Sequence, residues 1–284
     1  MNEQNIKQRE FWSGKGGESW INDKDDMDRM LHTFGDHTAN LINIKNGDDV
    51  IDIGCGTGKT TEHLSNVVGK LGSVLGVDIS SSMIQHAEKI RKEKNINNIT
   101  YKEIDVQLDI LPPLSFDHAF SRFGVMFFDN PKKAFKNINK SLKKKGTIGF
   151  VCWQTPKQNP WHSITQKVIH SHFEIPQVTD IRAPSPFAFQ QEEYIREILE
   201  TANFSKVDVT PFNTKMIWFK GKTVEYAAQA MLERNPIIAQ QLESQQSKNI
   251  TKIINELADA YKPYYKDNLI FPASSWLVKA YKEN

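Results

Sequence analysis

Short apolar runs alternate with amphipathic stretches along the chain from about residue 48. Five of these runs are rich in β-branched or aromatic residues, which is typical of buried parallel strands. Amphipathic helices are predicted after Gly58, after Ser80, and from Pro131 to a stop at Gly146. Strands separated by helices of this length indicate a doubly wound α/β domain built on a parallel sheet. The predicted strands lie at 50–53, 74–77, 99–104, 116–120 and 147–153.

The segment that precedes this pattern has a different character. Residues 1–44 hold Trp12 and Trp20 among glycines and acidic residues, and they show no alternation of strand and helix signals. We therefore expect residues 1–44 to form an N-terminal arm or lid. Residues 45–155 are expected to form the ligand-binding core, because the strand and helix signals alternate most regularly there.

The alternation becomes less regular after residue 155. A sixth strand is predicted at 206–209 and a last strand at 268–280. Between these strands, residues 223–262 place apolar side chains at helical spacing. We interpret residues 156–284 as the rest of the sheet, with a helical cap insertion at about 221–266.

The most informative motif follows the first predicted strand. It reads Val50-Ile-Asp-Ile-Gly-Cys-Gly-Thr-Gly58, with glycines at positions 54, 56 and 58. Glycines permit a tight turn and allow a ligand to approach the backbone closely, because no Cβ is in the way. Several classes of nucleotide bind to such a turn between a strand and a helix, so the surrounding residues have to decide among them.

Two phosphate-binding motifs fit this turn poorly. A P-loop that ends at Gly58-Lys59-Thr60 requires a glycine at position 53, where the chain has Ile53. The dinucleotide fingerprint requires its third glycine at position 59, where the chain has lysine. In both cases Asp52 would place a carboxylate beside a phosphate. The turn is better suited to a ligand without phosphate.

S-adenosylmethionine (SAM) has no phosphate and carries an amino group and a sulfonium, so a carboxylate such as Asp52 is favourable near it. Asp78 closes the second predicted strand, where it can accept hydrogen bonds from both ribose hydroxyls. Asp105 follows the third strand and can accept a hydrogen bond from the adenine amino group, while Met83 and Ile79 offer apolar surface to the base. Each of these carboxylates alone could be an ordinary polar residue at the end of a strand. Three of them at the ends of three successive strands favour a SAM site.

These motifs resemble the class I SAM-dependent methyltransferases, in particular the branch that includes the ubiquinone/menaquinone-biosynthesis methyltransferases. The similarity covers roughly residues 48–153. It implies a seven-stranded sheet whose last strand is antiparallel, SAM as the cofactor and S-adenosylhomocysteine as the product. The matching segments are 52–58, 76–83, 104–105, 121–128 and 142–146.

The resemblance also implies roles for individual residues. Ser121 and Arg122 would face the methionyl group and the site of methyl transfer, and Trp20 would cover the cofactor. Gly54 and Gly56 would line the methionine end. The cofactor-binding residues expected in this way, together with those argued from the motif itself, are Trp20, Asp52, Gly54, Cys55, Gly56, Gly58, Asp78, Ile79, Met83, Asp105, Val106, Ser121 and Arg122.

No residue is an obvious catalyst, and methyl transfer does not require one. The reaction is an in-line displacement at an activated carbon, so the protein has to align the reactants and exclude water. A base is needed only when the acceptor loses a proton. His162 is a candidate base or a loop histidine packed on Trp161. Arg122 can steer a substrate carboxylate or pair with a local acid, and His32 of the arm can reach the substrate.

Composition narrows the choice of partners. A net charge of +2 gives no electrostatic argument for nucleic acid or a membrane surface. The two cysteines, Cys55 and Cys152, suggest neither a disulfide framework nor a metal site. We find no apolar run long enough for a membrane span and no signal-like segment after Met1, so we expect a cytoplasmic protein. Either a monomer or a homodimer is compatible with the sequence.

The sequence therefore predicts a SAM-dependent methyltransferase that acts on a small-molecule acceptor, at oxygen or carbon. A SAM-binding protein without transferase activity and an RNA-modifying methyltransferase are the alternatives. The amino-methylating DNA enzymes carry an Asn/Asp-Pro-Pro-Tyr/Phe/Trp motif after strand four, whereas this chain reads Ser-Arg-Phe-Gly at 121–124. That difference and the low net charge disfavour a nucleic-acid acceptor.

Overall fold

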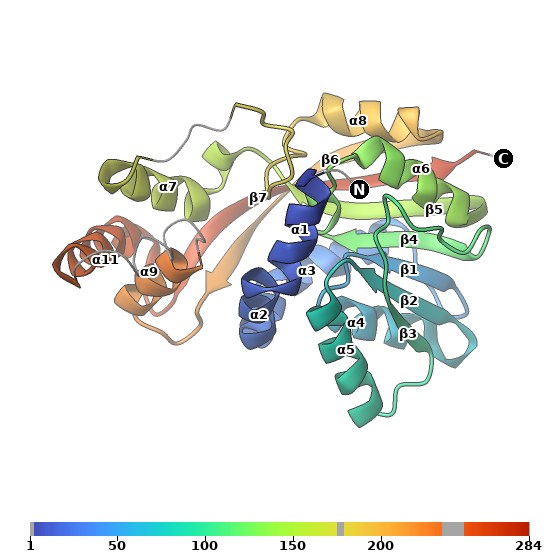
Figure 1. Cartoon of the computed structure of the whole chain (residues 1–284), viewed down its shortest axis with the longest axis horizontal. Coiled ribbons are helices and arrows are strands. Elements are labelled where there is room, and N and C mark those ends of the chain that lie inside the picture. Colours follow the sequence, from blue (N-terminus) through green and yellow to red (C-terminus); the bar gives the residue numbers. More distant parts are fainter. Residues whose placement is uncertain (1–2, 175–178, 235–246, 284) are drawn as a thin grey trace. The chain divides into compact units, whose positions relative to one another are not determined.

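The computed structural model of the chain describes residues 3–174, 179–234 and 247–283 (Figure 1). Its internal contacts divide the chain into two compact units. The core unit comprises the described parts of 1–153, 181–212 and 275–284, and the insert unit comprises those of 154–180 and 213–274. No described helix combines the length and apolar character needed to cross a bilayer.

A seven-stranded sheet has the strand order β3-β2-β1-β4-β5-β7-β6. Strands β1 to β5 pair in parallel, and β7 pairs with β5 in the antiparallel direction. This arrangement confirms the predicted α/β fold with seven strands and an antiparallel last strand. The strands are β1 (Asp49–Ile53), β2 (Ser73–Asp78), β3 (Ile99–Glu103), β4 (Phe116–Arg122), β5 (Leu142–Trp153), β6 (Phe204–Trp218) and β7 (Leu269–Lys282).

Within the core unit, α3, α4 and α5 lie on one side of the sheet and α6 and α8 on the other (Figure 1). Local signals set the starts of several helices. The Ser80 hydroxyl accepts a hydrogen bond from Met83 N at the start of α5, and Asn130 does the same for Lys133 N at the start of α6. The helices are α1 (Glu3–Ser13), α2 (Lys15–Asn22), α3 (Lys24–Leu41), α4 (Lys59–Val68), α5 (Ser81–Glu93), α6 (Pro131–Ser141), α7 (Pro160–His172), α8 (Glu192–Thr201), α9 (Val224–Glu233) and α11 (Ser247–Tyr261).

The N-terminal segment is helical, and its third helix packs onto the sheet. Phe34 of α3 is fully buried. Its ring lies 5.3 Å from the rings of both Phe123 and Trp153, measured between centroids. Phe123 and Trp153 stack on each other at 4.1 Å. Helix α3 is therefore part of the hydrophobic core, and α1 and α2 precede it.

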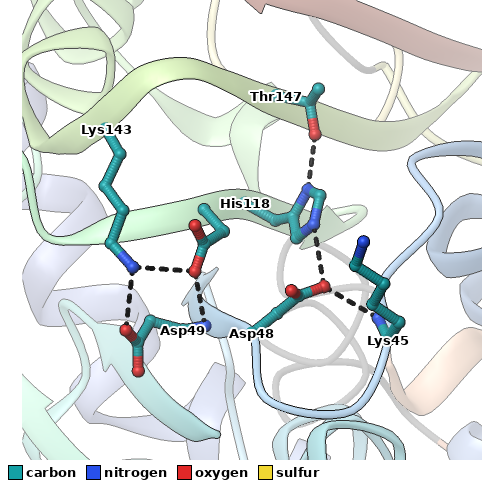
Figure 2. Close-up of polar contacts among 7 residues, drawn as sticks. Lys45, Asp48, Asp49, His118, Lys143 and Thr147 are labelled. Atoms are coloured by element: carbon teal, nitrogen blue, oxygen red, sulfur yellow. Dashed lines mark hydrogen bonds and ion pairs between the residues drawn. The ribbon is translucent and has the colours of Figure 1, made fainter.

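The helix that begins at Pro131 ends at Ser141, so the predicted stop at Gly146 is wrong. Strand β5 begins at once with Leu142. Leu142 already pairs with Phe116 of β4, and the Lys143 ammonium next to it donates to the Asp49 and Asp117 carboxylates at 2.9 and 2.8 Å (Figure 2). Those carboxylates lie near the starts of β1 and β4, so the chain joins the sheet before it reaches Gly146.

His118 of β4 joins the same end of the sheet. Its Nδ1 lies 2.6 Å from the Thr147 hydroxyl and its Nε2 lies 3.1 Å from the Asp48 carboxylate (Figure 2). Burial lowers the pKa of His118, while the nearby Asp48 opposes that shift. This cluster links β1, β4 and β5 at their amino ends, away from the glycine-rich turn at the carboxyl end of β1.

The sixth strand is much longer than the predicted run at 206–209, since β6 extends from Phe204 to Trp218. Pro211 interrupts the apolar pattern there, and proline cannot donate a backbone hydrogen bond to a sheet. Because β6 is an edge strand, proline is tolerated. The helical pattern predicted for 223–262 contains α9 and α11, while its stretch 235–246 lies outside the described residues.

Candidate cofactor site

The glycine-rich turn connects β1 to α4 at the carboxyl ends of the parallel strands, where open α/β sheets bind ligands. Gly54, Gly56 and Gly58 have φ angles of +69°, +54° and +84°. This left-handed region strains every residue with a Cβ, so the turn requires glycine at all three positions. Cys55 lies between the first two glycines and is buried, which raises the pKa of its thiol.

The three glycines face different surroundings. A Cβ on Gly54 would lie 2.9 Å from the Cα of Gly124, and a Cβ on Gly58 would lie 2.3 Å from the Tyr101 hydroxyl. Both positions are closed by packing within the protein. A Cβ on Gly56 would instead lie at ordinary contact distance, 3.6 Å, from Met83 Sδ and from Trp20 Nε1. Gly56 therefore lies against Met83 and Trp20.

Asp78 ties the end of β2 to this turn. Its carboxylate accepts hydrogen bonds from Gly56 N at 2.8 Å and from Ser80 N at 2.9 Å. Burial raises the pKa of Asp78, and these backbone amides oppose the rise because they favour the ionised form. Ile79 follows directly, and its amide also lowers the pKa of this carboxyl. A buried carboxylate thus lies against the middle glycine of the turn.

Asp52 lies inside β1, just before the turn, and is almost fully buried. Its carboxylate accepts a hydrogen bond from the Thr61 hydroxyl of α4 at 2.7 Å. Burial raises the pKa of Asp52 to about 7, against the effects of Thr61 and the positive charge of Arg122. The site therefore holds a carboxyl group that a nearby cation would readily ionise. Sequence reasoning missed Thr61, which lies one helical turn into a segment identified only as a helix.

The end of β3 carries a second buried carboxylate. Asp105 accepts hydrogen bonds from Gln107 N at 3.0 Å and from the Asn5 amide at 2.5 Å. The Asn5 side chain in turn accepts a hydrogen bond from the Gln107 amide at 2.6 Å. Val106, which lies between Asp105 and Gln107 in the sequence, is also buried. Neither Asn5 nor Gln107 was predicted; for Asn5, no local signal connects it to Asp105, which lies 100 positions away in the sequence.

Ser121 and Arg122 stand at the carboxyl end of β4, next to the turn. The Ser121 hydroxyl donates to Ile53 O at 2.7 Å and accepts from Gly124 N at 3.3 Å. Ser121 therefore connects the loops that follow β1 and β4. The Arg122 guanidinium donates to the Asp28 carboxylate of α3 at 2.9 Å. The sequence left two roles open for Arg122, steering a substrate carboxylate or pairing with a local acid, and the structure shows the pairing.

Aromatic residues of the N-terminal helices surround the turn. Besides Trp20 near Gly56, the ring of Trp12 lies 6.3 Å from that of Trp20 and 5.0 Å from that of Phe127. The Trp12 carbonyl accepts a hydrogen bond from the Ser80 hydroxyl at 2.7 Å. Helices α1 and α2 are thereby attached to the end of β2, beside the glycine-rich turn (Figure 1).

The two candidate histidines lie in different units. His162 belongs to α7 of the insert unit, so it is helical and not in a loop. Burial lowers its pKa to about 4, and its ring lies 5.6 Å from that of Trp161. The imidazole is therefore neutral at pH 7 and able to accept a proton. His32 is exposed on α3, with Nδ1 2.8 Å from Arg29 O. Among the described residues, no three His, Cys, Asp or Glu side chains are grouped to hold a metal ion.

Comparison with known proteins agrees with this geometry. The profile of a methyltransferase-domain family matches residues 44–209. The demethylmenaquinone methyltransferase of Staphylococcus saprophyticus is 29% identical over 183 residues, which cover 60% of this chain and 76% of that protein. The juvenile hormone acid O-methyltransferase of Bombyx mori is 27% identical over 184 residues, which cover 63% of this chain and 64% of that protein. The solved YcgJ protein of Bacillus subtilis shares the fold, with a TM-score of 0.59 at 15% identity over 89% of this chain and 99% of that chain.

Proposed function

We propose that this chain, which belongs to the methyltransferase-domain family and is a class I SAM-dependent methyltransferase, methylates an oxygen or carbon atom of a small, largely apolar acceptor. The observation that carries the cofactor assignment is the meeting of Gly56 with Asp78, Met83 and Trp20 at one place. The Gly56 amide binds the Asp78 carboxylate at 2.8 Å, and a Cβ on Gly56 would lie 3.6 Å from the thioether and from the indole.

In the proposed binding mode, each part of SAM meets residues of suitable chemistry. The amino acid end lies against the backbone of the turn at Gly54 and Gly56. Asp78 accepts hydrogen bonds from the ribose hydroxyls, and it has lone pairs left after binding two backbone amides. The adenine base packs near Met83, and its amino group donates to Asp105. The buried Asp52 favours the positive charge of the bound ligand.

SAM supplies an electrophilic methyl group, which the acceptor atom attacks while the bond to sulfur breaks and S-adenosylhomocysteine leaves. The protein has to hold the acceptor in line and keep water away. His162 stays the candidate base for a hydroxyl or an enolisable carbon; burial keeps it unprotonated at pH 7 but lowers its pKa to about 4, which makes it a weak base. Arg122 is held by Asp28 and therefore acts through its charge near Asp52.

The apolar character of the acceptor is proposed from the relatives. The relatives named above act on demethylmenaquinone and on juvenile hormone acid. We propose that α1 and α2, the first part of the predicted arm at 1–44, act as a lid, that 45–155 bind SAM, and that the helical insertion at about 221–266 serves as a cap for the acceptor.

Methyl transfer from radiolabelled SAM tests this function. The acceptors are the reduced naphthoquinone menadiol, a long-chain isoprenoid carboxylic acid, and bulk tRNA as the nucleic-acid comparison. We expect label in the quinol or the acid and none in tRNA, and we expect Asp78→Ala to abolish it. Label in tRNA alone would refute the small-molecule proposal. Calorimetry of SAM binding to Asp78→Ala separates a lost cofactor site from a wrong acceptor.

A further inference from the structure

Asn5 of α1 closes the adenine end of the proposed cofactor site. Its side chain is only 3% exposed, and the Asp105 residue that it contacts is only 2% exposed. The Asn5 amide group donates to one carboxylate oxygen of Asp105, while Gln107 N donates to the other. Because Asn5 contacts the Asp105 carboxylate and both residues are hidden from solvent, a ligand cannot reach Asp105 while α1 stays in place.

Two further contacts attach α1 to the same strand ends. The Arg9 guanidinium pairs with the Glu103 carboxylate, the last residue of β3, at 2.9 Å. Farther along the helix, the Trp12 carbonyl accepts a hydrogen bond from the Ser80 hydroxyl after β2. Helix α1 therefore lies across the ends of β2 and β3, where the nucleoside half of SAM is proposed to bind.

We propose that α1 is a lid that imitates the cofactor: the Asn5 amide donates to Asp105 the hydrogen bond that the adenine amino group donates when SAM binds. This inference rests on the proposed function, because it uses Asp105 as the adenine acceptor. Both groups are planar NH₂ donors, so the same carboxylate serves each in turn. The exchange keeps the buried Asp105 carboxylate hydrogen-bonded both in the empty and in the loaded protein. A buried carboxylate without a partner would cost free energy of folding or binding.

The exchange has a consequence for binding. Cofactor binds only to molecules in which the first turns of α1 have released Asp105, so the apparent affinity is reduced by the fraction of open molecules. Removing the Asn5 amide removes a hydrogen bond to a charged group and shifts the population toward the open state. We expect Asn5→Ala to bind S-adenosylhomocysteine roughly tenfold more tightly and to associate with it faster.

The test compares the full-length wild type with Asn5→Ala in calorimetry and in stopped-flow tryptophan fluorescence, with S-adenosylhomocysteine as the probe. Ile6→Ala is the matched control, because Ile6 is the next residue of α1 and is 41% exposed. Arg9→Gln loosens α1 without touching Asp105 and should change the affinity by no more than about twofold. Amide hydrogen exchange of residues 3–9 in the wild type should increase when S-adenosylhomocysteine saturates the protein.

Three results would overturn the lid. Weaker binding by Asn5→Ala, together with increased protection of α1 on saturation, would mean that Asn5 helps to hold the cofactor. Equal effects of Asn5→Ala and Ile6→Ala would mean that the contact with Asp105 does not control access. Absence of binding by folded wild type and folded Asn5→Ala alike would remove the site itself, and with it the proposed function.

Discussion

The contact between Gly54 and Gly124 can be tested by replacing each glycine with alanine. The two glycines differ in backbone conformation, so the cost of the contact can be separated from the cost of the φ angle. Gly54 has a left-handed φ of +69°, whereas Gly124 has an ordinary φ of −87°. A Cβ on Gly124 would lie 2.8 Å from Ile53 O and 3.0 Å from the Cα of Gly54, and both of these are backbone atoms. Alanine at either position therefore forces the loops after β1 and β4 apart.

The expected magnitudes follow from these two differences. Overpacking costs roughly 1–3 kcal/mol, and a left-handed φ costs an alanine roughly 1–2 kcal/mol more. Gly124→Ala should then lower the free energy of unfolding by roughly 1–3 kcal/mol and Gly54→Ala by roughly 2–5 kcal/mol. Gly47→Ala is the matched control, because Gly47 has a φ of +92° and a Cβ placed there would meet nothing within 4 Å; it should cost only the roughly 1–2 kcal/mol of the φ angle.

Urea unfolding followed by tryptophan fluorescence gives the free energy of unfolding of each variant. The double variant Gly54→Ala/Gly124→Ala should cost less than the sum of the two single variants, because one separation of the loops relieves both clashes. SAM affinity should fall in both single variants and stay unchanged in Gly47→Ala. Wild-type stability in Gly124→Ala, or a cost of Gly54→Ala no larger than that of Gly47→Ala, would show that the two loops do not press against each other.

Three other predictions concern the site and the opposite end of the sheet. Burial raises the pKa of Asp52 to about 7, so this carboxyl stays protonated up to a higher pH in the folded chain than in the unfolded chain. The free energy of unfolding should therefore fall by roughly 4 kcal/mol between about pH 4 and pH 7, and Asp52→Asn should lose that dependence in urea titrations. Gly56→Ala should cost only the roughly 1–2 kcal/mol of its φ angle but weaken SAM binding by about tenfold or more in calorimetry, and unchanged affinity would contradict the proposed binding mode. Burial lowers the pKa of His118 below 6.5, so stability should decline as the pH drops below that value, and His118→Gln should reduce the decline.

The parts of the fold that follow from local sequence were predictable. β1 is buried on both faces, so it reads as an apolar run, and the glycines that follow it are required by their φ angles. Asp78 was identified because a polar residue directly after a buried strand has to lie at the ligand-binding edge of the sheet. In each case, the residue's own conformation or its immediate neighbours carry the signal.

The remaining parts depend on contacts between distant segments. β5 begins at Leu142 because this residue pairs with Phe116 of β4, and the helical pattern that precedes it contains no trace of that partner. Gly124 has an ordinary φ, so only its contact with Gly54 shows why it is glycine. Asn5 reaches Asp105 across 100 positions. Sequence periodicity cannot report such pairs, because it records only the environment shared by neighbours along the chain.

These differences divide the proposed cofactor site into two halves with different mechanical properties. The half around Gly54 and Gly56 is held by backbone contacts and by backbone amides bound to Asp78, so we expect it to keep its shape when a ligand binds. The half around Asp105 is completed by a side chain of α1, which a few hydrogen bonds and one ion pair hold in place. The cofactor binds only after Asn5 has left this half, so the release of Asn5 limits the fraction of molecules that can bind. Opening of the adenine end should therefore control the rate of association, whereas the half around Gly56 needs no such rearrangement.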